Sequence, residues 1–455
     1  MEIVKNKEYT VDILDNGYQG EGIAKINELI IFIQGAIKGE KVKILITKIT
    51  KSHAYGKILE IIDKSKDRID VDCKTYKRCG GCNLRHINYE KTLEIKKETV
   101  ENCIYKELKK KIKISKTIGM ENPYHYRNKL QYPIGIDKNN LPKMGVYAER
   151  THEIIDTDVC FIQNELCEKI AKDIFNYVVD NNMSVYNEKT LKGELRHIVI
   201  KIGIKTNEVM VILVVNGNKL TKQDELIGYI GKKYFNIESI IKNVNNKNTN
   251  VILGNKNEVI YGEDHITDVL GEYKFKISAS SFYQVNPIQT EILYNTALEF
   301  AELKGDESAL DLYCGIGSIA IFMANHVKRV YGIEIVEDAI KNAEENVKLN
   351  KISNAKFKVG EVENVLPEII KEEKIEADVV FLDPPRSGCD IKTIETLLKL
   401  EPKKIVYISC NPATLARDLR LLNEKYNIEK VQPVDMFPFT HHVECVTLLQ
   451  FKNDL

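Results

Sequence analysis

The pattern of apolar and polar residues changes along the chain, and each change predicts a different structure. Residues 8–62 hold short apolar runs between glycines, which predicts a small closed barrel of the oligonucleotide-binding type. The runs are 9–14, 29–33, 42–49 and 55–62. Residues 89–115 repeat apolar positions at helical spacing, with lysines opposite. A β-rich section then reaches about residue 273, with a loop at 243–250 turning into a strand at 251–254.

From residue 309 onward strands and helices alternate, which predicts a parallel α/β sheet. Strands are expected at 309–313, 329–335, 377–382 and 405–408, with a last antiparallel strand at 446–451. We therefore expect three parts. A barrel covers 1–63, a central β-rich domain covers 64–88 and 120–273, and a Rossmann-like domain with a seven-stranded sheet covers 89–119 and 274–455.

Composition narrows the class of protein. Of 455 residues, 43% are hydrophobic and 29% are charged, which is typical of a folded protein. No run approaches the roughly 20 apolar residues of a membrane span, and residues 1–7 lack the apolar stretch of a signal peptide. We expect a cytoplasmic protein that contacts no membrane. Its ten cysteines are then better candidates for metal ligands or catalytic thiols than for disulfides.

Charge is balanced overall but not locally. The 66 basic and 66 acidic residues cancel, which argues against strong bulk attraction to nucleic acid. Residues 51–150, however, contain 23 Lys and Arg against 13 Asp and Glu, an excess of ten. Such a region is either a solvated lysine-rich face or a surface for a phosphate backbone, and charge alone does not choose.

Three clustered cysteines suggest a metal site. Five residues separate Cys73 from Cys79 and two separate Cys79 from Cys82, while Cys160 is the best distant fourth ligand. Four thiolates suit either zinc or an iron–sulfur cluster. The compact group around two glycines, with one distant partner, favours a fully ligated, structural iron–sulfur cluster.

The Rossmann-like part carries a nucleotide-binding pattern. Gly315, Gly317 and Ala320 form a glycine turn between a strand and a helix. Glu334 ends the next strand, nineteen residues beyond Gly315, where a carboxylate accepts hydrogen bonds from a ribose diol. The pattern does not distinguish NAD from S-adenosylmethionine.

Two further strand ends carry reactive groups. Asp383 ends one strand before Pro-Pro-Arg386, and Cys410 ends the next, with Asn411 as a helix N-cap. The helix N-terminus favours a thiolate, so we expect the pKa of Cys410 to lie below its reference value, although a structural cysteine fits the same pattern. Glu444, near the last strand, is a candidate general base or a salt-bridged carboxylate.

Together these motifs resemble the RNA uridine-5-methyltransferase family, in its iron–sulfur, TRAM-bearing ribosomal RNA branch. The resemblance spans nearly the whole chain, and five motifs carry it. These are Ser-Phe-Tyr-Gln-Val-Asn-Pro at 281–287, Asp-Leu-Tyr-Cys-Gly-Ile-Gly at 311–317, Asp-Pro-Pro-Arg at 383–386, Ser-Cys-Asn-Pro at 409–412 and His-Val-Glu at 442–444. It implies a [4Fe-4S] cluster on Cys73, Cys79, Cys82 and Cys160. It also implies S-adenosylmethionine contacts from Gln284, Tyr313, Glu334 and Asp383, with Cys410 as nucleophile and Glu444 as base.

The resemblance implies methylation of uridine carbon 5 in RNA through a covalent cysteine–uracil adduct. Phe282 is a candidate to stack on a flipped base, or a core residue, and Arg127, Asn128 and Arg386 are candidate uracil contacts. We expect 23S ribosomal RNA as the first substrate, transfer RNA as the second, and a monomer. Three alternatives are a 5-methylcytidine enzyme, a non-catalytic ribosome assembly factor, and a dehydrogenase.

Overall fold

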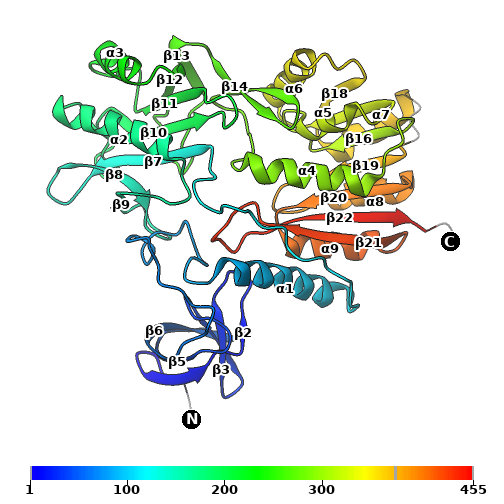
Figure 1. Cartoon of the computed structure of the whole chain (residues 1–455), viewed down its shortest axis with the longest axis horizontal. Helices are drawn as coiled ribbons and strands as arrows, with labels where there is room; N and C mark the ends of the chain where they lie inside the picture. Colours follow the sequence, from blue (N-terminus) through cyan, green and yellow to red (C-terminus); the bar gives the residue numbers. More distant parts are fainter. Residues whose placement is uncertain (1–2, 374–376, 453–455) are drawn as a thin grey trace.

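The computed structural model describes residues 3–373 and 377–452, which fold into three lobes (Figure 1). An N-terminal barrel lies at the bottom of the view. A central sheet lies at the upper left, and a second α/β sheet that contains the C-terminus lies at the right. In the part of the chain that is described, no helix is both long and apolar enough to cross a membrane.

The N-terminal barrel is a six-stranded sheet wrapped around an apolar core. Its order is β1-β5-β6-β4-β3-β2, with bounds β1 Glu8–Asp12, β2 Asp15–Asn16, β3 Gly22–Ile26, β4 Leu29–Ile33, β5 Lys41–Ile49 and β6 His53–Asp63. Alternate residues of β5, Val42, Ile44 and Ile46, point into the core and are fully buried. The expected runs omitted β3, whose short sequence mixes glycine and lysine with its apolar residues.

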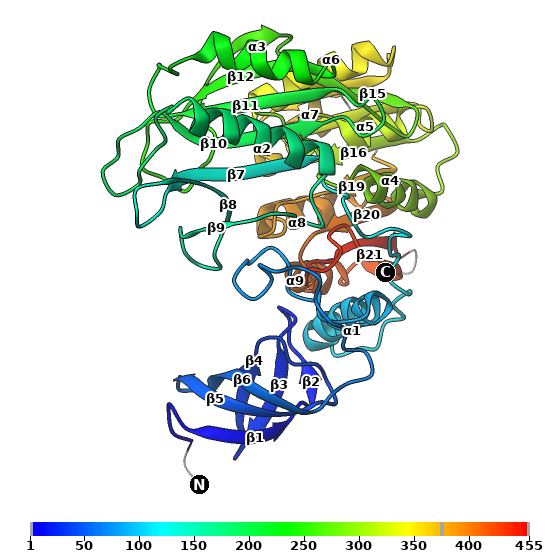
Figure 2. The same cartoon turned by 60° about the vertical axis from the view of Figure 1, so that its left-hand side comes forward.

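Helix α1, Tyr89–Leu108, connects the barrel to the C-terminal sheet, where it lies against α9 (Figure 2). Asn88 caps its first turn by accepting from the backbone N–H of Glu90. The helix ends at Leu108 and not at residue 115 as predicted, because Lys109 adopts the left-handed conformation with φ of 54°. Beyond the turn, Ile114 still reaches the core that α1 shares with the C-terminal sheet.

The central lobe is a seven-stranded sheet of order β13-β12-β11-β10-β7-β8-β9. Its elements are β7 Lys129–Ile136, β8 Pro142–Tyr147, β9 Ile154–Asp156, α2 Glu165–Asp180, β10 Leu195–Ile202, β11 Val209–Val215, α3 Gln223–Lys233, β12 Ile237–Val244 and β13 Lys256–Gly262. Helices α2 and α3 cover one face. A ribbon of β14, His265–Leu270, and β15, Tyr273–Ser278, packs on part of the other.

The strand predicted at 251–254 is wrong, and the cause is local hydrogen bonding. The side-chain amide of Asn245 donates to the carbonyls of Val251 and Ile252, and that of Asn243 donates to the carbonyl of Gly254. These backbone groups are therefore paired with side chains in a turn rather than with a neighbouring strand.

The C-terminal lobe is a seven-stranded sheet of order β18-β17-β16-β19-β20-β22-β21, in which β22 runs antiparallel to both of its neighbours, β20 and β21, and all the other strands run parallel to one another. Its elements are α4 Pro287–Ala301, β16 Ser308–Leu312, α5 Ser318–Ala324, β17 Arg329–Glu334, α6 Glu337–Leu349, β18 Ala355–Val359, α7 Val362–Glu373, β19 Val379–Leu382, α8 Ile391–Leu400, β20 Lys404–Ser409, α9 Pro412–Leu422, β21 Tyr426–Val434 and β22 Glu444–Phe451. Helices α1, α7, α8 and α9 cover one face, and α4, α5 and α6 cover the other.

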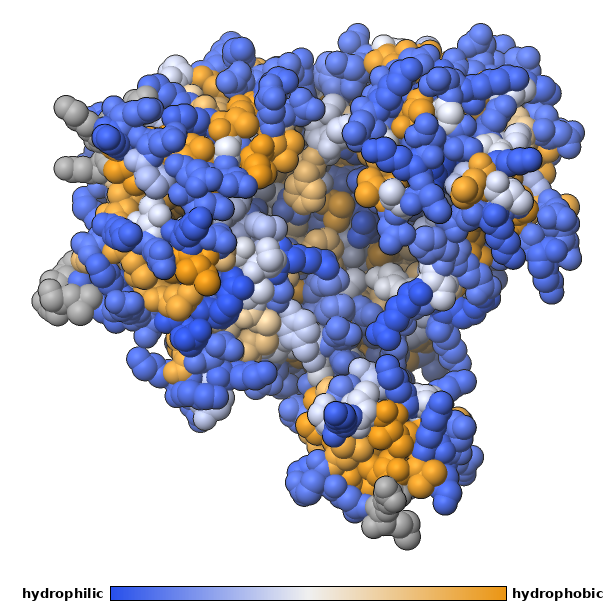
Figure 3. All heavy atoms as spheres, turned by 180° about the vertical axis from the view of Figure 1, so that it is seen from behind, coloured by the Kyte–Doolittle hydropathy of each residue, from blue (hydrophilic) through white to orange (hydrophobic). Residues whose placement is uncertain are grey.

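Seen from behind, the surface is hollowed between the two upper lobes, and an apolar patch lies on the barrel (Figure 3). Exposed apolar side chains of the barrel include Ile30, Ile49, Tyr55, Leu59 and Ile62. The candidate site is expected at the carboxyl ends of the C-terminal sheet, because these ends form the ligand crevice of an open α/β sheet.

Candidate active site

Four predicted site residues lie at one edge of the C-terminal sheet. Leu312 of β16 pairs with Ile333 of β17 and with Leu382 of β19. Leu382 in turn pairs with Tyr407 of β20. The residues that follow or end these strands are Tyr313, Glu334, Asp383 and Cys410. The parallel register therefore brings the four together at the carboxyl edge of the sheet.

Glu444 joins this edge from the antiparallel strand β22. Ser409 of β20 pairs with Cys445 of β22, so that Cys410 and Glu444 are the next opposed positions. Cys410 is half-buried, whereas Glu444 is only 5% exposed. Burial, and after it the charge of Asp383, raise the pKa of Glu444 to about 8, against the opposing charge of Arg386.

The predicted low pKa of Cys410 is wrong for the protein alone. Burial raises the pKa of this thiol to about 11, and the negative charges of Glu444 and Asp383 act in the same direction. Arg386 opposes them, but without reversing the shift. The helix cap itself is as predicted, since Asn411 accepts from the backbone N–H of Ala413 and Pro412 begins α9. The local helix N-terminus is thus outweighed by burial first and by two carboxylates from other strands second.

The segment before Glu444 is anchored to α1. A buried ion pair joins Lys96 to Asp435, and the hydroxyl of Tyr89 donates to the other carboxylate oxygen of Asp435 at 2.8 Å. Farther along, the backbone N–H of Leu84 donates to the carbonyl of Phe439 at 2.9 Å. The loop that leads to Glu444 is therefore held by residues more than three hundred positions earlier.

The glycine turn holds the carboxylate of Glu334. Gly315 and Gly317 have φ of 54° and 78°, and the N–H of Gly315 donates to Glu334 Oε2 at 3.1 Å. The N–H of Val336 donates to Oε1 at 3.0 Å. Each carboxylate oxygen keeps a further lone pair for a ribose hydroxyl. Beneath the turn, buried Asp311 accepts from Ala320 N–H, while its Oδ1 has no partner among the described residues.

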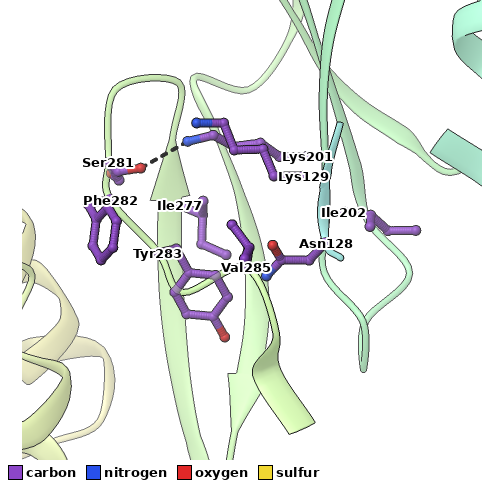
Figure 4. Close-up of a pocket in the computed structure, with 9 residues that line it drawn as sticks. All are labelled: Asn128, Lys129, Lys201, Ile202, Ile277, Ser281, Phe282, Tyr283 and Val285. Atoms are coloured by element: carbon purple, nitrogen blue, oxygen red, sulfur yellow. Dashed lines mark hydrogen bonds between the residues drawn. The ribbon is translucent and has the colours of Figure 1, made fainter. Parts of the chain in front are cut away.

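Gln284 and Phe282 lie in the segment between β15 and α4. The side-chain amide of Asn128 donates to the Gln284 carbonyl at 2.9 Å. Phe282 is 73% exposed, which excludes the core alternative. A small pocket beside it is lined by Asn128, Lys129, Lys201, Ile202, Ile277, Ser281, Phe282, Tyr283 and Val285 (Figure 4). Buried Lys201 donates to the carbonyls of Ser278 and Ser281.

The four predicted ligand cysteines meet in one cavity between the lobes. Cys73, Cys79, Cys82 and Cys160 line it, together with Arg85 and apolar residues. In residues 3–373 and 377–452, no three of these sulfur atoms lie within 4.8 Å of one another. A tetrahedral zinc ion would hold sulfur atoms about 3.8 Å apart, since each Zn–S bond is about 2.3 Å. The four sulfur atoms therefore do not stand at the spacing of a single tetrahedral zinc ion.

Sequence reasoning missed two residues that connect these sites. Arg85 forms an ion pair with Asp72 and lies 4.5 Å from the ring centroid of Phe439, so it links the cysteine cavity to the loop before Glu444. Tyr18, in the barrel, donates to Asn411 at 2.7 Å. A single buried arginine and a loop tyrosine carry no periodic signal, so no feature of the sequence pointed to them.

The fold and the strand-edge site define a methyltransferase with an appended barrel. A family model described as tRNA (Uracil-5-)-methyltransferase matches residues 88–452, and a TRAM domain model matches residues 4–59. The chain belongs to the tRNA (uracil-5-)-methyltransferase family, which confirms the predicted family, enzyme class and TRAM barrel.

Relatives agree over the full chain. The chain is 46% identical to an uncharacterized RNA methyltransferase of Clostridium tetani, with 99% of this chain and 98% of that protein covered. It is 45% identical to an uncharacterized RNA methyltransferase of Staphylococcus aureus, with 99% of each covered. The solved structure of Pyrococcus abyssi tRNA (uracil-54, C5)-methyltransferase with S-adenosyl-L-homocysteine is similar with a TM-score of 0.76 and 27% identity, covering 97% of this chain and 99% of that one.

Proposed function

We propose that this enzyme methylates carbon 5 of a uridine in RNA through a covalent bond between Cys410 and the uracil. The observation that carries the proposal is the opposition of Cys410 and the buried carboxyl of Glu444 at the carboxyl edge of the sheet. A nucleophile facing a base is the arrangement that addition and elimination on one ring require.

The residues of the chain would divide the chemistry as follows. The Cys410 thiolate adds to carbon 6 of uracil, and carbon 5 thereby gains enolate character and forms the bond to the methyl group. Glu444 then removes the proton from carbon 5, and the electron pair of that C–H bond expels Cys410. Arg386, whose positive charge lowers the pKa of both groups, favours their ionised forms during these steps.

We propose that Gln284, Tyr313, Glu334 and Asp383 hold S-adenosylmethionine. The carboxylate of Glu334, fixed by two backbone N–H groups with lone pairs to spare, fits a ribose diol. Buried Asp383, with a pKa raised to about 7 by desolvation, fits a positively charged ligand. When bound, S-adenosylmethionine supplies the methyl group and a sulfonium charge that favours ionised Cys410 and Glu444.

We further propose that Cys73, Cys79, Cys82 and Cys160 hold a [4Fe-4S] cluster. Support comes from the four thiols in one cavity and from their spacing, which is too wide for a single zinc ion. Such a cluster supplies a covalent cross-link between the segment at 73–82 and the segment at 160. The three residues directly after Cys82 contact the loop before Glu444. They are Asn83, Leu84 and Arg85.

As substrate we propose 23S ribosomal RNA first and transfer RNA second. The resemblance to the ribosomal RNA branch supports the first. The similarity to the Pyrococcus abyssi transfer RNA enzyme supports the second. We propose that Phe282 stacks on the flipped base and that Arg127 and Arg386 contact it, since the exposed ring of Phe282 is free to meet a base. Asn128 is a weaker candidate, because its amide already binds the Gln284 carbonyl.

Nucleoside mass spectrometry tests the proposal. Ribosomal and transfer RNA would be taken from a strain lacking the gene, from its parent, and from the deletion strain carrying either wild-type protein or Cys410→Ala. We expect 5-methyluridine to disappear from large-subunit RNA in the deletion strain and to return only with the wild-type protein. Unchanged 5-methyluridine in both RNA pools, together with no activity of the purified protein, would contradict the proposal and favour a non-catalytic RNA-binding role.

A further inference from the structure

A tyrosine of the barrel reaches the loop that carries the nucleophile. Tyr18 lies in the turn between β2 and β3, and its hydroxyl donates to Asn411 Oδ1 at 2.7 Å. Asn411 directly follows Cys410 in the sequence, although it is 393 positions from Tyr18. In both ribbon views the barrel lies below α1 and α9 (Figures 1 and 2). The contact therefore joins the first lobe of the chain to the catalytic loop of the last.

The side chain of Asn411 is held from three directions. Its Oδ1 also accepts from the N–H of Ala413 at 3.0 Å, which starts α9. Its Nδ2 donates to the carbonyl of Arg386 at 2.9 Å, in the loop after β19. The hydroxyl of Tyr18 supplies the third anchor. Because Cys410 lies between Asn411 and the end of β20, fixing this amide restricts the backbone that aims the sulfur.

The turn that carries Tyr18 is held in place by close packing against Leu84. Gly20 has φ of +83°, and a Cβ at this position would lie 2.5 Å from Leu84 Cδ2. Only glycine combines this backbone conformation with so close an approach. The ring centroid of Tyr18 lies 6.4 Å from that of His441, three residues before Glu444. The turn thus packs against Leu84 and against His441 in the loop before Glu444.

The hydroxyl of Tyr18 is a dependable donor. Burial raises the pKa of this phenol to about 12, and the nearby thiols Cys103 and Cys410 act in the same direction. The phenol therefore keeps its proton at neutral pH. Tyr18 is 42% exposed, so the position of its ring depends on how the barrel is docked rather than on deep burial.

We infer that Tyr18 is a positioning residue for Cys410, and that the barrel completes the catalytic loop in addition to any hold it has on RNA. The inference rests on the proposed function, because it assigns a role to the contact beside the proposed nucleophile. A barrel that served RNA binding alone would not need a hydrogen bond to the N-cap next to Cys410. Through this contact, the position of the Cys410 sulfur depends on how the barrel packs against the rest of the protein.

The test compares Tyr18→Phe, which removes the hydroxyl and keeps the ring, with the wild-type full chain. A matched control is Tyr9→Phe, since Tyr9 lies in the same barrel and its hydroxyl accepts a local N–H, from Val4. RNA from a strain lacking the gene supplies the unmethylated substrate. The rate of methyl transfer and the KM for RNA are measured for each protein. The rate of covalent adduct formation is measured for each variant combined with Glu444→Gln.

We expect Tyr18→Phe to slow methyl transfer and adduct formation by the same factor, about three- to tenfold, as for one lost hydrogen bond. The KM for RNA should stay within about twofold, and Tyr9→Phe should match the wild type. An unchanged adduct rate would overturn the inference. So would a raised KM with unchanged kcat, which would make Tyr18 an RNA contact. Absence of 5-methyluridine formation by the wild-type protein would instead contradict the proposed function, and the inference with it.

Discussion

The protein contains two cysteine sites that share one electrostatic property and differ in what surrounds them. Burial raises the pKa of Cys410 to about 11, and in the four-cysteine cavity it raises that of Cys82 to about 12 and that of Cys160 to about 11. Around Cys410 the nearest charges are two carboxylates and Arg386. Around Cys82 they are mostly other thiols, with Arg85 opposing them.

The comparison shows that a helix N-terminus alone does not ionise a buried thiol. Each site needs positive charge from a ligand before its sulfur ionises. In the cavity the metal corners of a cluster would supply it to all four thiols at once. At Cys410 the carboxylates of Glu444 and Asp383 suit a positively charged methyl donor. The thiol itself stays accessible, so that it can attack a substrate. The four-cysteine cavity should therefore determine the stability of the protein, and Cys410 should determine its turnover.

The largest expected effect is on turnover. Cys410→Ser should lower the rate of methyl transfer by about 10⁴-fold or more, because a serine hydroxyl ionises far less readily than a thiol. Its affinity for RNA and its melting temperature should match the wild type. Cys103→Ala, which alters another half-buried thiol near the site, serves as the control and should stay active. Turnover by Cys410→Ser close to that of the wild type would remove the distinction between the two sites.

The converse effect is expected in the cavity. Cys82→Ala should lose most of the iron and acid-labile sulfide of the purified protein, and should melt about 5–10 °C lower, because the cross-link between distant segments is lost. The control is Cys167→Ala, which changes a buried thiol on α2 outside the cavity. Iron content should be unchanged in that control. A Cys82→Ala protein with wild-type iron content would refute the ligand assignment.

A smaller effect is expected on the ionisation of Cys410. Without methyl donor, alkylation of this thiol by iodoacetamide should accelerate with rising pH toward about 11, since only the thiolate reacts and its pKa is raised. Asp383→Asn removes a neighbouring negative charge, so it should lower the pKa and speed alkylation at pH 9 about two- to fivefold. Exposed Asp338 supplies a control variant, Asp338→Asn. Slower alkylation of Asp383→Asn would contradict the charge assignment, as would a plateau at neutral pH.

Local sequence was sufficient to predict the strand ends that carry the site. The apolar run before Cys410, followed by Asn411 and Pro412, encodes a strand, a cap and a first helical turn within eight residues. The same holds for the glycine turn before Glu334, because its φ angles are accessible to glycine. These features depend on neighbours in the chain, so pattern reasoning reaches them.

Long-range effects could not be predicted in this way. The pKa of Cys410 depends on Glu444 from an antiparallel strand and on Asp383 from a parallel one, and no local pattern gives their combined charge. The end of α1 at Leu108 depends on a left-handed Lys109, where glycine is the usual signal. Tyr18 meets Asn411 only because the barrel docks where it does.

The most direct test of the account is capture of the covalent intermediate. Glu444→Gln protein would be mixed with unmethylated RNA and S-adenosylmethionine, denatured, and digested with protease and nuclease. Mass spectrometry would then identify any peptide that carries a nucleotide. The account predicts a methylated uridine bonded to Cys410, because the variant lacks the base that starts elimination. Free turnover of Glu444→Gln without such a peptide, or a nucleotide bonded to another cysteine, would contradict it.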